Sequence, residues 1–187
     1  PMFASGLAVT AQVTAASLLL AFALGALIAV GKVLPFRPLR AALDFYTSIF
    51  RGVPLIVLLF IAYFATPQLT GYKIGMFTAA VLTLGLNGSA TVSEPLRGGI
   101  EGVDAGQYDA ARSVGLSYAK MMRLVVIPQA LRSVAPALVN EVITVLKSSS
   151  LVATIGLMDM MRAAQSVQAI TYRAFEPFIV VAIVYYV

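Results

Sequence analysis

The chain has 187 residues, of which 60% are hydrophobic and only 11% are charged. Soluble domains carry about 25% charged residues, so this composition is typical of a protein that lies in a membrane. Cysteine and histidine are absent, which excludes disulfides, thiol chemistry and imidazole bases. The net charge of +5 does not indicate nucleic-acid binding, because the basic residues stand at the ends of apolar runs, where membrane orientation explains them.

Five apolar runs are interpreted as membrane-spanning helices, which need about 20 residues for a full crossing. The first run is uncharged from Pro1 to Gly31, too long for the apolar region of a signal peptide, so we interpret it as a retained span. The last run stops about halfway through a bilayer, and we expect both chain ends to be cut. We predict an all-α membrane protein, a single domain over residues 1–187 with a bundle of five spans. The predicted spans are 7–31, 53–66, 74–95, 130–157 and 175–187.

Basic residues gather in the first and third connections between these spans. The first connection carries Lys32, Arg37, Arg40 and Arg51. Pro35 and Pro38 are expected to break the helix in this connection. Because loops rich in lysine and arginine face the cytoplasm, both connections are predicted to be cytoplasmic. The N-terminus then lies outside and the C-terminus inside.

The third connection, residues 97–128, carries charges of both signs on amphipathic spacing. A short helix within it would show a small, apolar stripe of residues about one turn apart, formed by Tyr108, Ala111, Val114 and Gly115. Such a face can enter a groove on a partner, or the helix can lie at the lipid interface. Gly115 is expected to end the helix or to admit a neighbouring backbone, and Pro128 to begin or bend the next helix.

This connection resembles the cytoplasmic coupling motif of ABC importer permeases. That motif reads Glu-Ala-Ala, three residues, Gly, nine residues, then Ile-x-Leu-Pro. The corresponding residues here keep the spacing: Asp109, Ala110, Ala111, Gly115, Val125, Val126, Ile127 and Pro128. Asp109 stands where the family usually has Glu, which keeps the carboxylate but shortens its reach to a partner.

Flanking stretches resemble the polar amino acid permeases of the same superfamily, from Arg51 to about Arg162. They are RGVPLIVLLF, LNGSATVSEPLRGGIEGV and PALVNEVITVLKSSSLVATIG. The resemblance implies the type I importer fold, in a multi-pass protein of the bacterial cytoplasmic membrane. It also implies that a cytoplasmic helix docks on a separate ATPase. The docking residues would be Tyr108, Asp109, Ala110, Ala111, Arg112, Val114 and Gly115.

The same resemblance implies the partners of the chain. They are an ATP-binding subunit, a second permease copy or paralogue, an extracellular solute-binding protein, membrane lipid and a polar amino acid. ATP and Mg would be held by the partner ATPase, and this chain would bind no cofactor. It would carry no catalytic residues and no metal, and the transported amino acid stays open.

Polar residues at membrane depth are expensive, so each candidate needs a partner, water or a function. The candidates for the substrate path are Asn87, Ser89, Glu141, Lys147, Ser150, Asp159 and Arg162. Asn87 and Ser89 can instead form interhelical hydrogen bonds. The hydroxyls after Lys147 can unwind or cap a helix near the midplane.

Alternatives remain for the other candidates. Glu141 can serve polar gating or bundle structure. Glu94 and Arg97 are expected to pair with each other or cap their helix. The resemblance places Asp159 near the translocation path, but it can also neutralise Arg162 one turn away.

Two other classes of protein are compatible with these residues. In a self-sufficient secondary carrier or channel, Glu141, Lys147 and Asp159 would relay ions. In an intramembrane hydrolase, a serine of the 148–150 run would be the nucleophile, but adjacent helical residues point apart, so Lys147 is poorly placed as a base.

Overall fold

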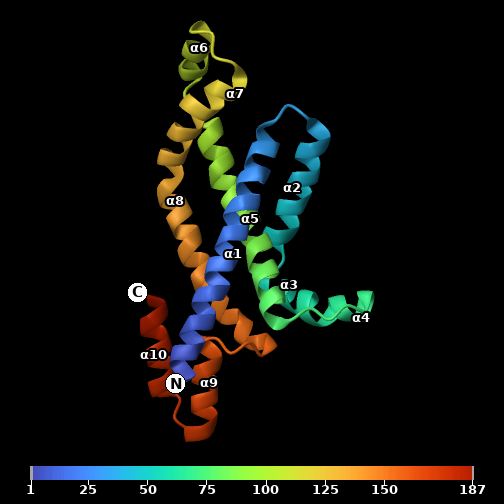
Figure 1. Ribbon diagram of the computed structural model, residues 1–187, viewed down its shortest axis with the longest axis vertical. Helices are drawn as coiled ribbons and strands as arrows, with labels where there is room; N and C mark the ends of the chain where they lie inside the picture. The colour runs from blue at the N-terminus through green and yellow to red at the C-terminus, as the bar shows by residue number, and fades with distance from the viewer. Residues whose placement is uncertain (1, 187) are drawn as a thin grey trace.

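The computed structural model describes residues 2–186, and every regular element in that range is a helix. The helices are α1 (Met2–Val33), α2 (Arg37–Gly52), α3 (Leu55–Phe60), η1 (Ile61–Ala65), α4 (Thr66–Thr70), α5 (Met76–Glu101), α6 (Ala105–Ser113), α7 (Tyr118–Met121), η2 (Met122–Val126), α8 (Ile127–Ser148), η3 (Ser149–Ile155), α9 (Met160–Thr171) and α10 (Phe175–Tyr186). They form an elongated bundle with α6 and α7 at one end and α9 and the N-terminus at the other (Figure 1).

Three helical segments in the described residues are long and apolar enough to cross a membrane. They are α1, α5 and the continuous segment Tyr118–Ile155. These segments overlap the predicted ranges 7–31, 74–95 and 130–157. The last predicted range, 175–187, contains the 12-residue apolar helix α10, and its final residue lies outside the described residues.

The region of the predicted second span differs from its prediction. Residues 37–52, expected to be a connection, form helix α2, and helix 55–70 follows it with a bend of 100°. Pro38 lies in the first turn of α2, where its missing N–H costs no hydrogen bond, so it begins this helix and does not break it. The bend falls at Val53 and Pro54, because a proline pushes its preceding residue out of the helical region.

Helices α1 and α5 form the centre of the bundle through small residues on their facing sides. Ala21 and Ala29 of α1 are fully buried, as are Gly25 of α1 and Gly88 of α5. A Cβ atom added at Gly88 would lie 2.9 Å from the Cβ of Ala21. Small residues thus bring the two backbones close together, as is common between membrane helices.

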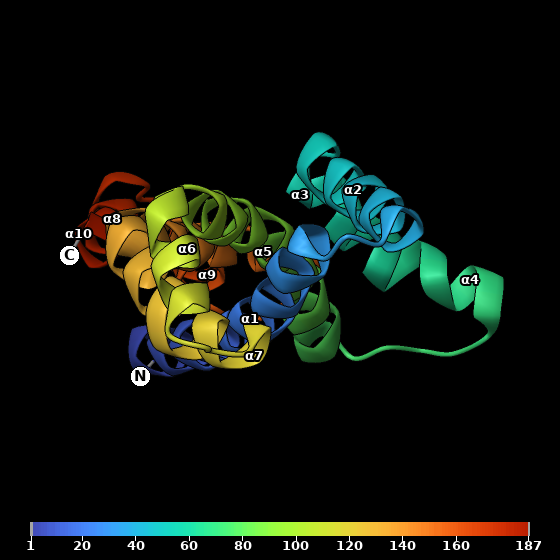
Figure 2. The same cartoon turned by 90° about the horizontal axis from the view of Figure 1, so that it is seen from above.

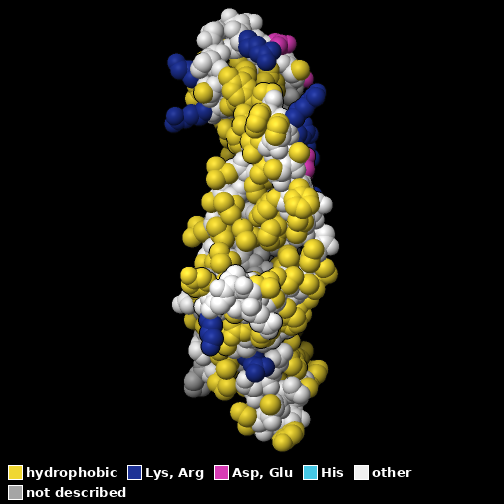
Figure 3. All heavy atoms as spheres, turned by 90° about the vertical axis from the view of Figure 1, so that its right-hand side faces the viewer, with side chains coloured by type: hydrophobic (Ala, Val, Ile, Leu, Met, Phe, Trp, Pro, Cys, Tyr) yellow, Lys and Arg dark blue, Asp and Glu magenta, His cyan; other side chains and the backbone are white. Residues whose placement is uncertain are grey.

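The remaining helices flank this pair. Helices α2 to α4 lie on one side of α1 and α5, and α8 to α10 lie on the other (Figure 2). Helix α4 projects away from the bundle (Figure 1). On the face seen in Figure 3, hydrophobic side chains cover the middle of the molecule and most charged side chains gather at the α6 end. This distribution is typical of a protein whose middle lies in lipid.

Candidate functional site

Helix α6 is the structured centre of the predicted coupling segment. It begins after Asp104, whose Oδ1 accepts a hydrogen bond from the N–H of Gly106 at 2.8 Å. A capping aspartate of this kind satisfies one of the free donors at a helix start. The short helix therefore has a defined beginning, three residues after Glu101 ends α5.

The other end of α6 is closed by a glycine. The N–H of Gly115 donates to the carbonyl of Arg112 at 2.9 Å. The N–H of Leu116 donates to the carbonyl of Ala111 at 3.1 Å. These two bonds form a Schellman motif, in which the residue with positive φ is usually glycine, and Gly115 has φ +76°. No other atom lies within 4 Å of a Cβ built at Gly115, so this glycine ends the helix and admits no neighbouring backbone.

The face of α6 that carries Tyr108 and Ala111 points into the protein. Ala111 is only 4% exposed and belongs to a hydrophobic cluster with Ile100, Met121, Val126 and Ala130. The hydroxyl of Tyr108 donates to the carbonyl of Ile100 at 3.0 Å, and burial raises its pKa. Tyr108 is partly buried and Ala111 is buried, so only part of the predicted docking stripe is exposed in the single chain, and its role in docking stays a prediction. Both residues pack in the cluster of Ile100, near the end of α5, and these contacts fix α6 to that helix.

The rest of α6 and the turn that follows it are exposed. Val114 is 74% exposed, and Asp109, Ala110 and Gly115 are exposed as well. Arg112 and Asp109 form a solvent-exposed ion pair, with Nη1 3.4 Å from Oδ1. Beside this face lies an open hollow of about 260 Å³, lined by Gln107, Ala110, Ala111, Val114, Leu116 and Val125. The exposed face combines a charge pair with small and apolar atoms.

Asn87 and Ser89 lie on α5 and hold it to α2. The side-chain amide of Asn87 donates to the carbonyl of Phe50. The hydroxyls of Ser89 and Tyr46 are 2.8 Å apart, and Ser89 is fully buried. These are the interhelical hydrogen bonds that the sequence left as an alternative to substrate contact. Both side chains are thereby occupied by α2.

Lys147 and Ser150 stand where α8 ends and the tighter helix η3 begins. The hydroxyl of Ser150 donates to the carbonyl of Lys147 at 2.8 Å. Both residues line an open hollow of about 390 Å³, together with Met161, Val181, Ala182, Tyr185 and Tyr186. The serine run thus coincides with a change of helix type, and Lys147 is exposed beside aromatic side chains. A ligand in this hollow would meet one cation and two phenol rings.

Asp159 and Arg162 do not neutralise each other through their side chains. Asp159 Oδ1 accepts a hydrogen bond from the backbone N–H of Arg162 at 2.8 Å and caps α9, while the guanidinium of Arg162 donates to Gln165. Asp159 is fully buried, and its Oδ2 has no hydrogen-bond partner among the described residues. Burial raises the pKa of this carboxyl, and the N–H of Arg162 offsets part of the effect.

Glu141 lies apart from Asp159 and makes no ion pair within residues 2–186. It stands on α8, six residues before Lys147. Within the same residues, no group of three or more acidic side chains could hold a metal ion. The three ionisable groups of the predicted ion relay, Glu141, Lys147 and Asp159, are therefore not joined by contacts.

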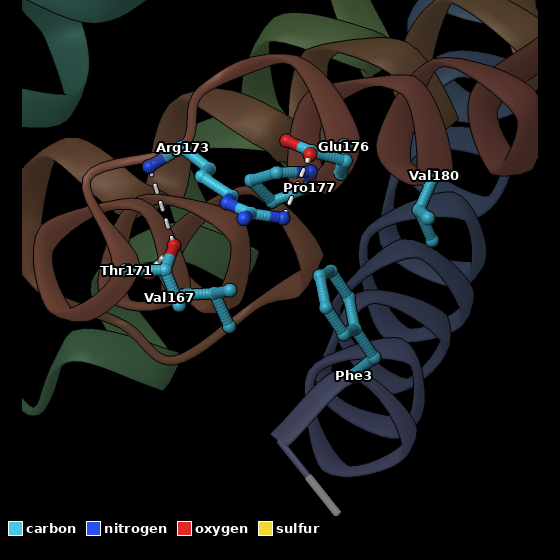
Figure 4. Close-up of a pocket in the computed structure, with 7 residues that line it drawn as sticks. All are labelled: Phe3, Val167, Thr171, Arg173, Glu176, Pro177 and Val180. Atoms are coloured by element: carbon cyan, nitrogen blue, oxygen red, sulfur yellow. Dashed lines mark hydrogen bonds and ion pairs between the residues drawn. The ribbon is translucent and has the colours of Figure 1, made fainter.

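A further hollow, of about 240 Å³, lies at the end of the bundle opposite α6. Its lining residues are Phe3, Val167, Thr171, Arg173, Glu176, Pro177 and Val180. Figure 4 shows Phe3 of α1 on one side and the pair of Arg173 and Glu176 on the other. This ion pair is 3.6 Å long and exposed, so the hollow is open to solvent or lipid headgroups.

The sequence analysis missed a buried charge. Lys32 was interpreted only as an orientation signal, but its side chain is 2% exposed and pairs with Asp44 and Glu94. Glu94 also pairs with Arg97, as predicted, at 2.9 Å. No local spacing indicates the pair of Lys32 and Glu94, because 62 residues separate them.

Comparison with known proteins gives the family of the chain. The model of the family described as the binding-protein-dependent transport system inner membrane component matches residues 21–187. The arginine transport system permease protein ArtQ of Bacillus subtilis is 45% identical over all of this chain and 85% of that protein. A putative glutamine transport system permease protein GlnP of Rickettsia bellii is 41% identical over 97% of this chain and 84% of its own length.

Solved structures agree. A crystal structure of an amino acid ABC transporter with histidines has a TM-score of 0.91 and 42% identity, covering all of this chain and 86% of that chain. The inward-facing MetNI methionine ABC transporter has a TM-score of 0.81, covering 99% and 90% of the two chains. At 21% identity, this second likeness supports the fold alone.

These findings favour the permease of a multi-component transport system over a self-sufficient carrier, a channel or an intramembrane hydrolase. They confirm the all-helical membrane fold of the ABC importer permease type and the resemblance on which it was predicted. The chain belongs to the family of binding-protein-dependent transport system inner membrane components.

Proposed function

We propose that this permease forms half of the translocation pathway of an ATP-driven importer for polar amino acids. The observation that carries the proposal is the geometry of α6. The helix is capped at both ends and fixed to the bundle by Tyr108 and Ala111, while its other residues from Asp109 to Gly115 are exposed. A rigid, exposed helix at one end of a membrane bundle can transmit force from a partner subunit without unfolding.

The partner that docks on this face is a separate ATPase, which holds ATP and Mg. Its contacts on α6 are Asp109, Ala110, Arg112, Val114 and Gly115, whereas Tyr108 and Ala111 act from behind by fixing the helix. Asp109 and Arg112 are more than half exposed, so their weak mutual pairing does not prevent exchange for charges on the partner. The chain itself carries no catalytic residue.

Two observations support a polar amino acid as substrate. The relatives are named for arginine and glutamine transport. In this chain, Lys147 and Ser150 line a hollow of about 390 Å³ together with the exposed Tyr186, and a carboxylate would be favoured beside the ammonium. Asp159 and Arg162 lie on the neighbouring helix start and are the nearest candidates for a charged substrate side chain. Asn87, Ser89 and Glu141 serve the bundle and its gating.

The pathway needs a second permease, because one bundle lines only one side of it. The second copy, or a paralogue, brings the second coupling helix. We expect the α6 end to face the cytoplasm of a bacterial cell, since most lysine and arginine side chains of the face in Figure 3 gather there. The N-terminus then lies outside and the C-terminus inside, and an extracellular solute-binding protein delivers the substrate.

The mechanism follows from the coupling of two equilibria. ATP binding favours the closed pair of ATPase subunits, and α6 moves with the subunit on which it docks. Because α6 follows α5 after only three residues, its movement acts directly on a spanning helix. The two bundles then alternate between inward and outward access.

The test is co-purification of the tagged chain from its native host membrane, with ATPase activity as the readout. Gly115→Asp strains the positive φ of the Schellman motif and adds a charge on the docking face, so we expect the recovered ATPase to fall about tenfold or more. Gly71→Asp is the matched control, since Gly71 has φ +77° and no atom within 4 Å of its Cβ position. Equal ATPase recovery from both variants would overturn docking at α6.

A further inference from the structure

A buried ammonium group joins three helices of the bundle. Lys32 Nζ of α1 lies 2.7 Å from Glu94 Oε1 of α5 and 2.9 Å from Asp44 Oδ1 of α2. It also donates to Thr47 Oγ1 of α2 at 2.7 Å. An ammonium group has three N–H donors, so this lysine uses all of them on two other helices.

Glu94 connects this lysine to the end of α5. Its second oxygen, Oε2, accepts hydrogen bonds from Arg97 Nη2 at 2.9 Å and Nε at 3.3 Å. Arg97 Nη1 then donates to Glu101 Oε2 at 2.6 Å. Glu101 is the last residue of α5, directly before the turn that leads into α6. A continuous series of ion pairs therefore runs from the base of α6 to α1 and α2.

Helix α2 is held by polar contacts and by Leu39 and Leu43, which lie against Gly31 of α1. Thr47 is its only buried residue, and none of its residues belongs to the hydrophobic clusters of the bundle. Its polar contacts to α5 are the hydrogen bonds of Tyr46 and Phe50 and the ion pair of Arg51 with Glu94 at 4.0 Å. In lipid there is no hydrophobic driving force between helices, so these polar bonds contribute to the position of α2 together with its close packing on α1.

The far end of α2 can absorb a rotation. Gly52 ends the helix, and the chain turns by 100° at Val53 and Pro54 before helix 55–70 begins. Gly52 has no atom within 4 Å of its Cβ position, so nothing packs closely on this glycine. A helix that is joined to the next one through a short bend can move as a rigid body about that bend.

We propose that Lys32 and Glu94 are positioning residues of the transport cycle, which pass the displacement of α6 to α2 through the ion pairs of α5. The proposal rests on the proposed function, because a partner ATPase must move α6. Networks of buried charge define a particular arrangement of helices better than they stabilise it. Movement of Glu94 with α5 therefore pulls Lys32, Asp44 and Thr47 with it, or exchanges these bonds for others.

The experiment uses two spin labels in the complete transporter, reconstituted in liposomes with its ATPase. The chain has no cysteine, so Ser48→Cys on α2 and Leu27→Cys on α1 give one labelled pair per copy of this chain, at exposed positions. The distance between the labels is measured with and without ATP and Mg. Import of radiolabelled arginine and glutamine is followed together with ATP hydrolysis.

Two variants interrupt the network and one serves as control. Glu94→Gln removes the charge shared by Lys32 and Arg97. The double variant Lys32→Met with Glu94→Met replaces the ion pair by apolar side chains of similar volume, which usually preserves folding. Glu176→Gln makes the same change as the first variant in an exposed ion pair at the opposite end of the bundle.

We expect ATP to change the distance between the labels in the parent and in Glu176→Gln, but not in the two network variants. Import per ATP hydrolysed should fall about tenfold in those variants while the ATPase still co-purifies. A folded double variant that keeps the ATP-dependent change and normal import per ATP would overturn the proposal, because the network would then serve structure alone.

The same measurements separate this inference from the function on which it depends. If the ATPase co-purifies with the parent but ATP does not change the label distance, α2 is not moved and only the inference fails. If no ATPase co-purifies with the parent, the proposed function fails and the inference fails with it.

Discussion

Among the neighbours of helix α5, α1 and α2 pack against it by different physical means. Its contact with α1 consists of close approaches at small residues. Cβ atoms added at Gly25 and Gly85 would lie 2.8 Å from Val92 and 2.5 Å from Leu20. Its direct contact with α2 consists of the hydrogen bonds of Tyr46 and Asn87 and the pair of Arg51 and Glu94, while Lys32 of α1 bridges Glu94 and Asp44.

The difference shows how one bundle can contain both a fixed and a movable part. Close-packed backbones lose many small attractions at once when they separate, so the pair of α1 and α5 has one favourable position. Polar bonds are few and directional, and they can be exchanged for others without loss of apolar contact. We therefore assign the scaffold to α1 and α5 and the movement to α2.

The largest effect is expected from Gly85→Val, which breaks the close contact of α1 and α5. A Cβ at this position lies 2.9 Å from both Cβ and Cγ of Leu20, so the helices must separate. We expect a loss of about 3 kcal/mol of stability, measured as a lower melting temperature in detergent. Gly98→Val is the control in the same helix, since no atom lies within 4 Å of its Cβ position. Equal melting of the two variants would remove the distinction between the contacts.

A smaller effect is expected from Asn87→Ala, which removes one hydrogen bond between α5 and α2. Hydrogen bonds between membrane helices contribute about 1 kcal/mol, so the melting temperature should fall slightly while the bundle stays folded. Asn140→Ala makes the same change at an exposed position of α8. If Asn87→Ala unfolded the protein as Gly85→Val is expected to do, α2 would belong to the scaffold.

The smallest effect is expected from Tyr46→Phe, which removes one hydroxyl and keeps the ring. This hydroxyl lies 3.0 Å from the carbonyl of Leu86 and 2.8 Å from Ser89 Oγ. Because Ser89 still donates to Leu86, no buried donor is left unsatisfied, and we expect a loss of about 0.5 kcal/mol. Tyr72→Phe, at a position 79% exposed, should melt like the parent. A loss as large as that of Gly85→Val would contradict this ranking.

The candidate site was predictable where one short segment of chain defines it. Gly115 could be placed at the end of a helix from the sequence, because the residue that follows a helix often has a positive φ and glycine adopts that conformation readily. The face of α6 that points inward could not be read in the same way. Tyr108 and Ala111 are compatible with an exposed stripe until Ile100 and Val126 approach from other helices and cover them. For Asp159, the spacing to Arg162 suggested an ion pair. In the structure its carboxylate instead accepts a hydrogen bond from the backbone N–H of Arg162 and caps α9.

The sequence by itself determined the class of the protein, the apolar runs of its longest helices and the short helix that ends at Gly115. These features follow from composition and from neighbours a few residues apart, which act in any fold. Only the tertiary structure decided that Pro38 begins a helix at the edge of the bundle, that the chain bends after Gly52, and that Lys32 is buried against Glu94. Such contacts join segments far apart along the chain, and local propensity cannot specify them because their energy exists only once the helices have packed.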